Sequence, residues 1–243
     1  ITDSPEKGLR ATPNNQLMQD SLIKIDLERS LRGGIQAMGL NLSSAQVDGL
    51  LDYLLEFQRW NKTHNLSAIH DLEESLTLHL LDSLVVLPYL DEFAEKFTSK
   101  GQTFTVADLG TGGGLPGIPL AICRPEWQLH LMEVVQKKTV FLQHIANKLS
   151  LKNVNVHGAR IEDSSPKLEN SISCCISRAF SDFGKFLSLS EPMLMNQGEA
   201  WAMKAKLLDE DLATIPSAWA IKNNHLLNVP GLMPEGAYLN WWA

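Results

Sequence analysis

The sequence predicts an α/β protein whose mostly parallel sheet is covered by helices on both faces, with a helical extension before it and an antiparallel hairpin after it. Three observations favour this fold. Before residue 100, apolar residues recur at helical spacing. After residue 103, short apolar runs alternate with helical segments, which is typical of parallel strands joined by helices. Residues 219–242 hold further apolar runs with Pro-Gly and Pro-Glu-Gly turns between them.

A helical region is expected over residues 21–100, after a polar, aperiodic and flexible leader at residues 1–20. Ser43 and Gln46 form a capping-box pattern ahead of apolar residues at helical spacing. Asp71 and Glu74 repeat the pattern before a second helix, whose apolar residues lie on more than one face. We therefore expect that helix to be buried on most sides and to end at Pro88.

Residues 101–243 are expected to form the sheet domain. Apolar runs at 104–109, 129–132, 154–157, 172–176 and 200–203 predict strands. Helical segments are expected between them, near 117–123, 137–150 and 182–195. The runs at 219–221, 225–229 and 238–242 predict an antiparallel hairpin that closes the sheet edge.

Composition excludes several classes of protein. The 243 residues carry 21 Lys and Arg against 28 Asp and Glu, with 9 and 15 of these in residues 1–100, so any nucleic-acid contact must come from a local basic patch. No apolar run is long enough to predict a membrane span, and no apolar signal core is visible. The three cysteines lack metal-ligand spacing and resemble buried free thiols of a reducing compartment. These features predict a cytoplasmic protein without a metal.

Residues 105–117 join an apolar strand to the start of a helix through a glycine-rich turn. Asp108 ends the strand, and the turn contains Gly110, Gly112, Gly114 and Leu115. Such a turn brings bare backbone N–H groups close to a bound nucleotide or nucleoside, because a Cβ would block the approach. Glu133 ends the second strand, where it could hold a ribose hydroxyl. The segment therefore predicts a cofactor site.

The turn alone is compatible with two cofactors. Gly112-Gly-Gly114-Leu-Pro-Gly117 satisfies the dinucleotide pattern, so NAD fits. S-adenosylmethionine is favoured, because Asp108 could meet the ammonium group that NAD lacks and because the turn is longer than a dinucleotide requires. The terminal hairpin also leaves no room for a separate dehydrogenase substrate domain. An NAD-dependent oxidoreductase and a non-catalytic adenosyl-nucleoside-binding regulator remain as alternatives.

Five motifs then point to one family: Trp60-Asn61-Lys62-Thr-His-Asn65-Leu, His79-Leu-Leu-Asp82-Ser83, Asp108-Leu-Gly-Thr-Gly-Gly-Gly-Leu-Pro-Gly-Ile-Pro, Arg124-Pro125-Glu126 and Ile176-Ser177-Arg178-Ala179-Phe180. In order and spacing they resemble the bacterial 16S ribosomal RNA guanine-N7 methyltransferase family, RsmG, also called glucose-inhibited division protein B. The resemblance runs from about residue 25 to the C-terminus. It implies a class I methyltransferase domain with a Rossmann-like sheet at residues 101–243, S-adenosyl-L-methionine as donor and a loop guanine of 16S ribosomal RNA as target.

The chain departs from the family pattern at a few positions. Glu133 ends the second strand where Asp is usual. Leu78 replaces a usually basic residue, and Ala205 follows Lys204 where Gly is usual. The last two departures bear on local RNA contacts and not on the fold.

Further cofactor residues follow from position and from the resemblance. Arg178 lies just past the carboxyl end of a buried strand, where α/β sheets bind ligands, although a salt bridge to a neighbouring acid is the alternative. Ile161 would stack on adenine, while Glu162 would read its edge or cap a helix. His79 and Asp82, three residues apart, are expected to make structural hydrogen bonds, and the resemblance allows a place at the border of the substrate pocket as the alternative. The expected cofactor set is Asp108, Gly110, Gly112, Gly114, Leu115, Glu133, Ile161, Glu162 and Arg178.

Basic residues around the expected cofactor mouth are assigned to RNA phosphates. Lys137 and Lys138 open a helix, where the helix dipole disfavours cations, so either a phosphate partner or simple solvation explains them. Asn61 and Asn65 either cap a loop or line the substrate pocket. The expected RNA set is Arg124, Lys137, Lys138, Lys204, Asn61 and Asn65, with Arg178 and Lys206 as further phosphate contacts.

The implied chemistry requires no catalytic acid or base. Guanine N7 has an in-plane lone pair and no proton to lose, so attack on a sulfonium methyl needs alignment and desolvation. The target guanine must be splayed from its stack. The expected partner is 16S ribosomal RNA or the small ribosomal subunit, bound by a monomer.

Overall fold

A seven-stranded sheet lies at the centre of the computed structural model, which describes residues 13–178, 180, 182–204, 209–232 and 238–242. The strands follow the order β3-β2-β1-β4-β5-β7-β6. Five are parallel: β1 (Thr105–Leu109), β2 (Gln128–Met132), β3 (Val154–His157), β4 (Ile172–Arg178) and β5 (Leu194–Lys204). β7 (Tyr238–Trp242) runs antiparallel to β5 and to the edge strand β6 (Ile221–Leu226). This order confirms the predicted parallel sheet and closing hairpin.

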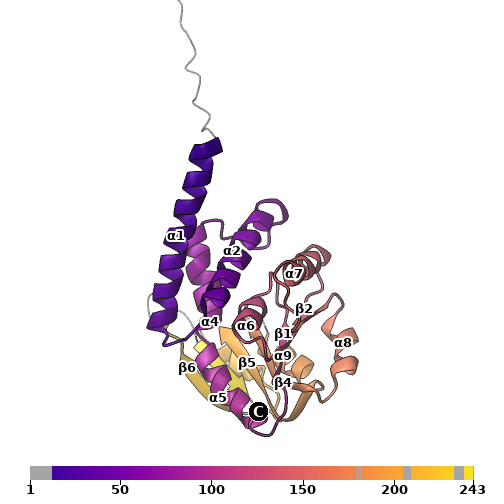
Figure 1. The fold of residues 1–243 in the computed structure, drawn as a ribbon. Coiled ribbons are helices and arrows are strands. Elements are labelled where there is room, and N and C mark those ends of the chain that lie inside the picture. Colours follow the sequence, from indigo (N-terminus) through magenta and orange to yellow (C-terminus); the bar gives the residue numbers. More distant parts are fainter. Residues whose placement is uncertain (1–12, 179, 181, 205–208, 233–237, 243) are drawn as a thin grey trace, which may run out of the picture.

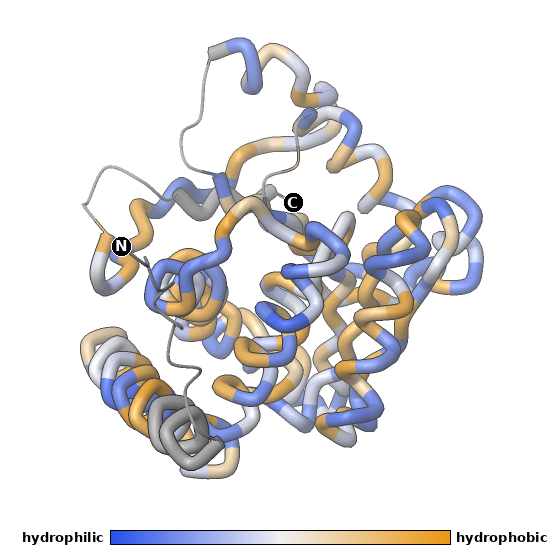
Figure 2. Tube along the Cα trace, turned by 90° about the horizontal axis from the view of Figure 1, so that it is seen from above, coloured by the Kyte–Doolittle hydropathy of each residue, from blue (hydrophilic) through white to orange (hydrophobic). Residues whose placement is uncertain are grey.

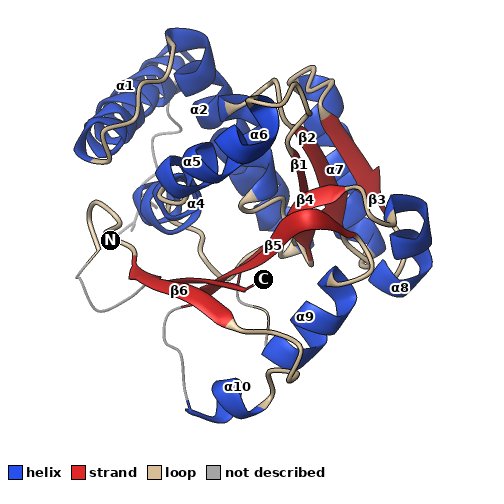
Figure 3. Cartoon of the chain, turned by 90° about the horizontal axis from the view of Figure 1, so that it is seen from below, coloured by secondary structure: helices blue, strands red, loops and turns tan. Residues whose placement is uncertain are grey.

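Helices cover both faces of the sheet (Figure 3). One face carries α1 (Pro13–Ala37), α2 (Ser44–His64), α5 (Leu87–Thr98), α6 (Gly117–Cys123) and α7 (Gln136–Lys148). The other carries α8 (Ile161–Ser164), the 3₁₀ turn η2 (Ser165–Leu168), α9 (Phe183–Ser190) and α10 (Asp209–Ala213). Because side chains alternate along a strand, Val106 of β1 joins the first core while Ala107 joins the second. The N-terminal helices therefore share a core with the sheet.

The helix starts follow local signals. At α2 the Ser43 hydroxyl accepts from the Gln46 N–H (3.3 Å) and the Gln46 side chain accepts from the Ser43 N–H (2.8 Å), which confirms the capping box. Asp71 caps α3 (Leu72–Ser75) by accepting from the Glu74 N–H at 2.8 Å. α1 is described from Pro13, so residues 13–20 of the segment expected to be a leader are helical.

Residues 72–84 form one buried helical segment with a π-helical middle. α3 continues into the π-helix η1 (Leu76–Leu81) and then α4 (Asp82–Leu84), and most of its side chains are buried, as predicted. The expectation that Pro88 ends a helix was wrong, because Pro88 lies in the first turn of α5, where its missing N–H is not needed. The helix expected over 182–195 stops at Ser190, since β5 begins at Leu194.

The helices are amphipathic in pattern. In Figure 2 hydrophilic and hydrophobic residues alternate along the helices, as in helices with one buried and one exposed face. Figure 1 shows α1 as the outermost helix. Among the helices that the structure describes, none combines the length and the apolar character needed to cross a membrane.

Candidate functional site

The glycine-rich loop between β1 and α6 adopts backbone angles that favour glycine. Gly110, Gly112 and Gly114 have φ values of +70°, +61° and +95°. A Cβ built at Gly112 meets no atom within 4 Å, whereas one at Gly114 would lie 2.5 Å from Ile118 Cγ1. Leu115 is 5% exposed and belongs to the core. Gly112 is thus the position where the loop faces open space.

The side chain of Asp108 is hydrogen-bonded to this loop and to the start of α6. Its side chain is completely buried and accepts hydrogen bonds from the Thr111 hydroxyl (2.6 Å) and the Gly117 N–H (2.8 Å), both through Oδ2. Burial raises the pKa of Asp108 from 3.8 to about 6, against the effect of these hydrogen bonds. The structure therefore gives Asp108 a role in shaping the loop through Oδ2. Its other oxygen, Oδ1, is buried without a hydrogen-bond partner among the described residues, and the expected contact with a cofactor ammonium stays a prediction.

A cavity of about 380 Å³ opens at the carboxyl ends of the strands, beside the loop. Glu133, 7% exposed, spans its base: its carboxylate accepts from the Gly112 N–H (3.0 Å) and the Val135 N–H (2.8 Å). Each carboxylate oxygen has two acceptor sites, so both keep capacity for a further donor. The lining residues are Gly110, Met132, Glu133, Val134, Ala159, Arg160, Ile161, Glu162, Phe180, Lys185 and Leu189.

The cavity brings together four residues of the expected cofactor set, namely Gly110, Glu133, Ile161 and Glu162. The sequence interpretation missed Phe180, whose ring would lie 3.8 Å from a Cβ on Gly110. Its place just after β4 was the available signal, because ligands bind beyond the carboxyl ends of such strands. No sequence signal marked Lys185, which arrives from α9.

Arg178 contacts the N-terminal helices and is absent from the lining of this cavity. Its Nη1 donates to the Leu78 carbonyl (2.8 Å) and to Asp82 Oδ2 (3.1 Å). Burial raises the pKa of Asp82, and Arg178 opposes that rise. His79 Nε2 lies 3.1 Å from the Ser67 hydroxyl. The salt-bridge alternative for Arg178 is therefore present, and so are the structural hydrogen bonds predicted for His79 and Asp82.

His79 predicts a loss of stability in mild acid. Burial, and secondly Arg178, lowers the pKa of His79 from 6.5 to about 4. Because its pKa is lower in the folded state, His79 contributes its full share to the stability of the folded state above pH 6.5. The protein loses this contribution as the pH falls from 6.5 towards 4. We expect this to remove up to roughly 3 kcal/mol of unfolding free energy.

Urea unfolding of the wild type and His79→Gln between pH 7 and 4 measures this loss. The difference between the two proteins should shrink as the pH falls, because glutamine does not titrate. Asp108, whose raised pKa acts in the opposite direction, is common to both proteins and cancels. A difference that stays constant with pH would contradict the assignment to His79.

Arg124 lies at the opposite edge of the sheet from the cavity. It follows α6, which carries the chain back from the loop to the amino end of β2. Its Nε and Nη2 donate to the two oxygens of Asp91 in α5, at 2.6 and 2.5 Å, and this pairing raises the pKa of Arg124. Position and pairing both argue against the expected phosphate contact.

Asn61 and Asn65 organise the loop after α2. The Asn61 side chain is buried, donates to the Ile69 carbonyl (2.8 Å) and accepts from the Ser67 N–H (2.8 Å). Asn65 is the C-cap of α2, with φ of +49°. These contacts are those of the loop-capping alternative, and neither side chain lines the cavity.

The lysines that were expected to contact RNA phosphates lie in different surroundings. Lys204, at the end of β5, is paired with Asp211 at 2.5 Å and lies 4.8 Å from the centre of the Phe183 ring. Lys137 is exposed and Lys138 half-buried in the first turn of α7, and neither forms an ion pair with a residue that the structure describes. Ala205 and Lys206 lie outside the described residues.

Helix α2 packs against the glycine loop. The buried Tyr53 hydroxyl of α2 donates to the Gly113 carbonyl at 2.8 Å. A Cβ on Gly113 would lie 2.2 Å from Phe57 Cε2, so glycine is required there by the packing of α2. Burial raises the pKa of Tyr53 well above its usual value, which keeps the hydroxyl as a donor. Sequence reasoning missed this contact.

Tyr53→Phe is expected to loosen the loop. Removal of the hydroxyl leaves the buried Gly113 carbonyl without this donor, at a cost of about 1–3 kcal/mol in unfolding free energy. We expect the affinity for S-adenosylmethionine to fall several-fold in calorimetric titration, because the loop loses its anchor. Tyr89→Phe, in α5 and away from the loop, is the matched control and should bind normally. Equal affinity in both variants would show that the anchor has no part in binding.

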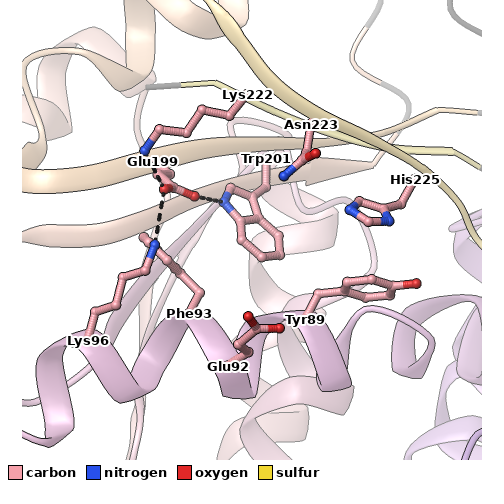
Figure 4. A pocket seen from close by; sticks show the side chains of 9 residues that line it. All are labelled: Tyr89, Glu92, Phe93, Lys96, Glu199, Trp201, Lys222, Asn223 and His225. Carbon is pink, nitrogen blue, oxygen red and sulfur yellow. Dashed lines mark hydrogen bonds and ion pairs between the residues drawn. The ribbon is translucent and has the colours of Figure 1, made fainter.

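A larger cavity, of about 540 Å³, lies between α5, β5 and β6 (Figure 4). The carboxylate of Glu199, 2% exposed, accepts there from Trp201 Nε1 (3.0 Å) and Lys222 Nζ (2.9 Å), and Lys96 Nζ lies 3.7 Å away. These contacts attach the terminal hairpin to α5. The cavity has neither the glycine loop nor Glu133 in its wall, and none of the expected cofactor residues lines it.

Comparison with known proteins identifies the family. A family model described as rRNA small subunit methyltransferase G matches residues 46–237. The ribosomal RNA small subunit methyltransferase G of Polynucleobacter asymbioticus is 43% identical over 203 residues, which cover 83% of this chain and 89% of that protein. The protein of the same name from Saccharophagus degradans is 39% identical over 207 residues, covering 85% and 87%.

Solved structures support the fold. A tRNA (m1A58) methyltransferase from Aquifex aeolicus has a TM-score of 0.50 at 15% identity, with 67% of each chain covered. That likeness concerns the fold alone, and with the strand order it confirms the expected class I, Rossmann-like architecture. On the match over residues 46–237 and the identity to its relatives, the chain belongs to the rRNA small subunit methyltransferase G family.

Proposed function

We propose that this protein transfers a methyl group from S-adenosyl-L-methionine to N7 of a loop guanine in 16S ribosomal RNA. Family membership supports the reaction and the class of RNA. The observation that carries the donor site is the open position at Gly112, next to Glu133 and the cavity at the strand ends. The five sequence motifs support guanine N7 as the methylated atom.

The residues around the cavity fit this donor. Gly112 leaves the space beside the loop free of a side chain, and Glu133 retains acceptor capacity for ribose hydroxyls. Ile161 offers an apolar surface to the adenine, with Glu162 beside it. Asp108, Gly114 and Leu115 would act by holding the loop from within, and Arg178 by fixing η1 against β4. We assign the donor to these eight residues together with Gly110.

The chemistry asks this chain for positioning and exclusion of water. The donor supplies an electrophilic methyl group on a sulfonium. Since N7 carries a free lone pair and no proton, no side chain has to act as a base. Asp108, which has a raised pKa, is buried and already accepts two loop hydrogen bonds, so it serves the loop and not proton transfer. The walls of the cavity hold the reacting groups together out of water.

Methyl transfer from labelled donor to 16S ribosomal RNA tests this function. Mass-spectrometric mapping of the RNA from cells with and without the protein should locate one N7-methylated guanine that depends on it. Calorimetry should detect binding of S-adenosylmethionine and none of NAD. Tight NAD binding without donor binding would overturn the proposal in favour of an oxidoreductase, while donor binding without methyl transfer would favour a regulator.

Lys137 and Lys138 are proposed to hold phosphates of the RNA. The double change of both to Ala should weaken RNA binding and lower the slope of log affinity against log salt by about 1.4, the loss of two phosphate contacts. Donor affinity should not change. Stability should stay equal or rise slightly, because two cations leave a helix N-terminus. A markedly lower melting temperature with normal methylation of the RNA would contradict the phosphate assignment.

The proposal extends to partners and location. The partner would be 16S ribosomal RNA or the small ribosomal subunit, met in the cytoplasm, and the chain would act as a monomer. Light scattering of the purified protein, with and without the RNA, measures the oligomeric state.

A further inference from the structure

The surface where α2 meets α7 is basic, although the protein as a whole is acidic. Residues 56–64 and 136–148 contain five Lys or Arg and one Glu, while the whole chain contains 21 and 28. α7 has no acidic residue. We call this surface the α2–α7 seam and define it by its cations and one histidine, namely Arg59, Lys62, Lys137, Lys138, Lys148 and His144.

Contacts across the seam show that α2 and α7 are antiparallel. Glu56 contacts Lys148 and His144, whereas Trp60, one turn later in α2, lies 5.2 Å from His144 and 5.5 Å from Phe141 between ring centres. The end of α2 therefore lies near the start of α7 (Figure 1). Because α7 follows the carboxyl end of β2, this is the end of the seam beside the cofactor cavity.

The acidic side chain of the seam is buried, whereas its basic side chains are exposed to solvent. The Glu56 side chain is 5% exposed, while its partners Arg59, Lys148 and His144 are 74%, 40% and 39% exposed. Burial alone would raise the pKa of Glu56, but hydrogen bonds from Lys148 and His144 lower it, so the carboxylate stays ionised. This buried anion holds two cations, Arg59 and Lys148, and the imidazole of His144 in place and leaves them facing solvent.

Exposed apolar side chains accompany the cations. Val134, Val135 and Val140 are 60%, 39% and 46% exposed, and Val134 lines the cofactor cavity. Cations beside apolar surface match single-stranded RNA, which presents phosphates together with unstacked bases. The seam is continuous with the cavity through Val134 and the first turn of α7.

We propose that the α2–α7 seam binds the RNA strand flanking the target base and leads that base to the cofactor cavity. The proposal rests on the proposed function and gives its RNA substrate a path over the molecule. Single-stranded RNA is the class of partner, held by its phosphates along α2 and α7. The nucleotides nearest the target lie over Lys137 and Lys138, and those further along the strand over Lys62, Arg59 and Lys148.

The test removes two cations from the α2 side of the seam, far from the donor. Arg59→Gln with Lys62→Gln should weaken binding to naked 16S ribosomal RNA roughly tenfold at 0.15 M salt and lower the salt slope by about 1.4. Methyl transfer at saturating RNA, donor affinity and melting temperature should stay unchanged. Arg29→Gln with Lys100→Gln is the matched control, because Arg29 is also 74% exposed and paired with an acid three residues away. Lys100 is exposed in the turn after α5.

The outcomes separate this proposal from the proposed function. Normal RNA binding by the seam variant, in a protein that methylates the RNA, would overturn the seam and leave the function intact. Equal weakening in the control variant would also overturn it, since the effect would then follow net charge alone. Loss of binding to whole small subunits but not to naked RNA would point to a ribosomal protein and overturn RNA as the partner. A wild-type protein that neither binds nor methylates the RNA would overturn both.

Discussion

Gly112→Val should abolish binding of S-adenosylmethionine in a protein that still folds. A Cβ at this position meets no atom within 4 Å, so the two methyl groups of valine would project into the space beside Glu133 that the donor needs. The φ of +61° adds about 1–3 kcal/mol of backbone strain, less than the stability of a typical domain. Calorimetric titration with the donor measures the loss, and circular dichroism establishes the fold.

Gly101→Val separates backbone strain from loss of ligand space. Gly101 has φ of +74° and also no atom within 4 Å of a built Cβ, but it lies in the turn between α5 and β1, at the amino edge of the sheet. This control should lose a similar amount of stability and bind the donor normally. A folded Gly112→Val protein with wild-type donor affinity would refute the assignment of the loop.

Arg178→Met should cost the protein about 3–5 kcal/mol of unfolding free energy. Its partner Asp82 has a side chain that is 18% exposed and would be left without a cation, and the Leu78 carbonyl would lose a donor. Methionine keeps most of the side-chain volume, so packing changes little. Urea unfolding at neutral pH measures the effect.

A double-mutant cycle tests whether the cost comes from the pair. Arg178→Met with Asp82→Leu should be less destabilised than Arg178→Met alone, because no unpaired carboxylate then remains buried. Donor titration of the folded Arg178→Met protein decides between the two roles of this residue. Lost donor binding with wild-type stability would mean that Arg178 touches the cofactor, as the sequence position first indicated.

Local signals in the sequence predicted much of the fold. The Ser43 capping box and the apolar runs of β1 to β4 lie within a few residues of the elements that they specify, so pattern and structure agree. The conformation of the glycine loop could also be predicted from local sequence, because its positive φ values occur at the loop's own glycines. For α5 the proline was interpreted as a helix end, although Leu90, Phe93 and Phe97 recur after it at helical spacing and proline in a first turn is also a start signal.

Contacts between distant residues were the part that the sequence did not predict. Asp91 pairs with Arg124 across 33 positions, Tyr53 contacts Gly113 across 60, and Arg178 contacts Asp82 across 96. The predicted helix at 117–123 and parallel strand at 129–132 already place Arg124 at the amino edge of the sheet, but the sequence does not indicate its partner Asp91. Site residues assigned by type and motif alone therefore included side chains that the fold uses for its own ion pairs.

The support that α2 gives to the glycine loop also has a consequence for biosynthesis. Tyr53 and Phe57 leave the ribosome before Gly113 and Phe141 exist, so their apolar surface stays uncovered while the nascent chain lengthens. The Tyr53 hydroxyl can donate to the Gly113 carbonyl only when α2 packs on the sheet. This support of the loop therefore forms only after both halves of the chain have met, and we expect a partly made polypeptide to hold the donor less tightly than the finished protein.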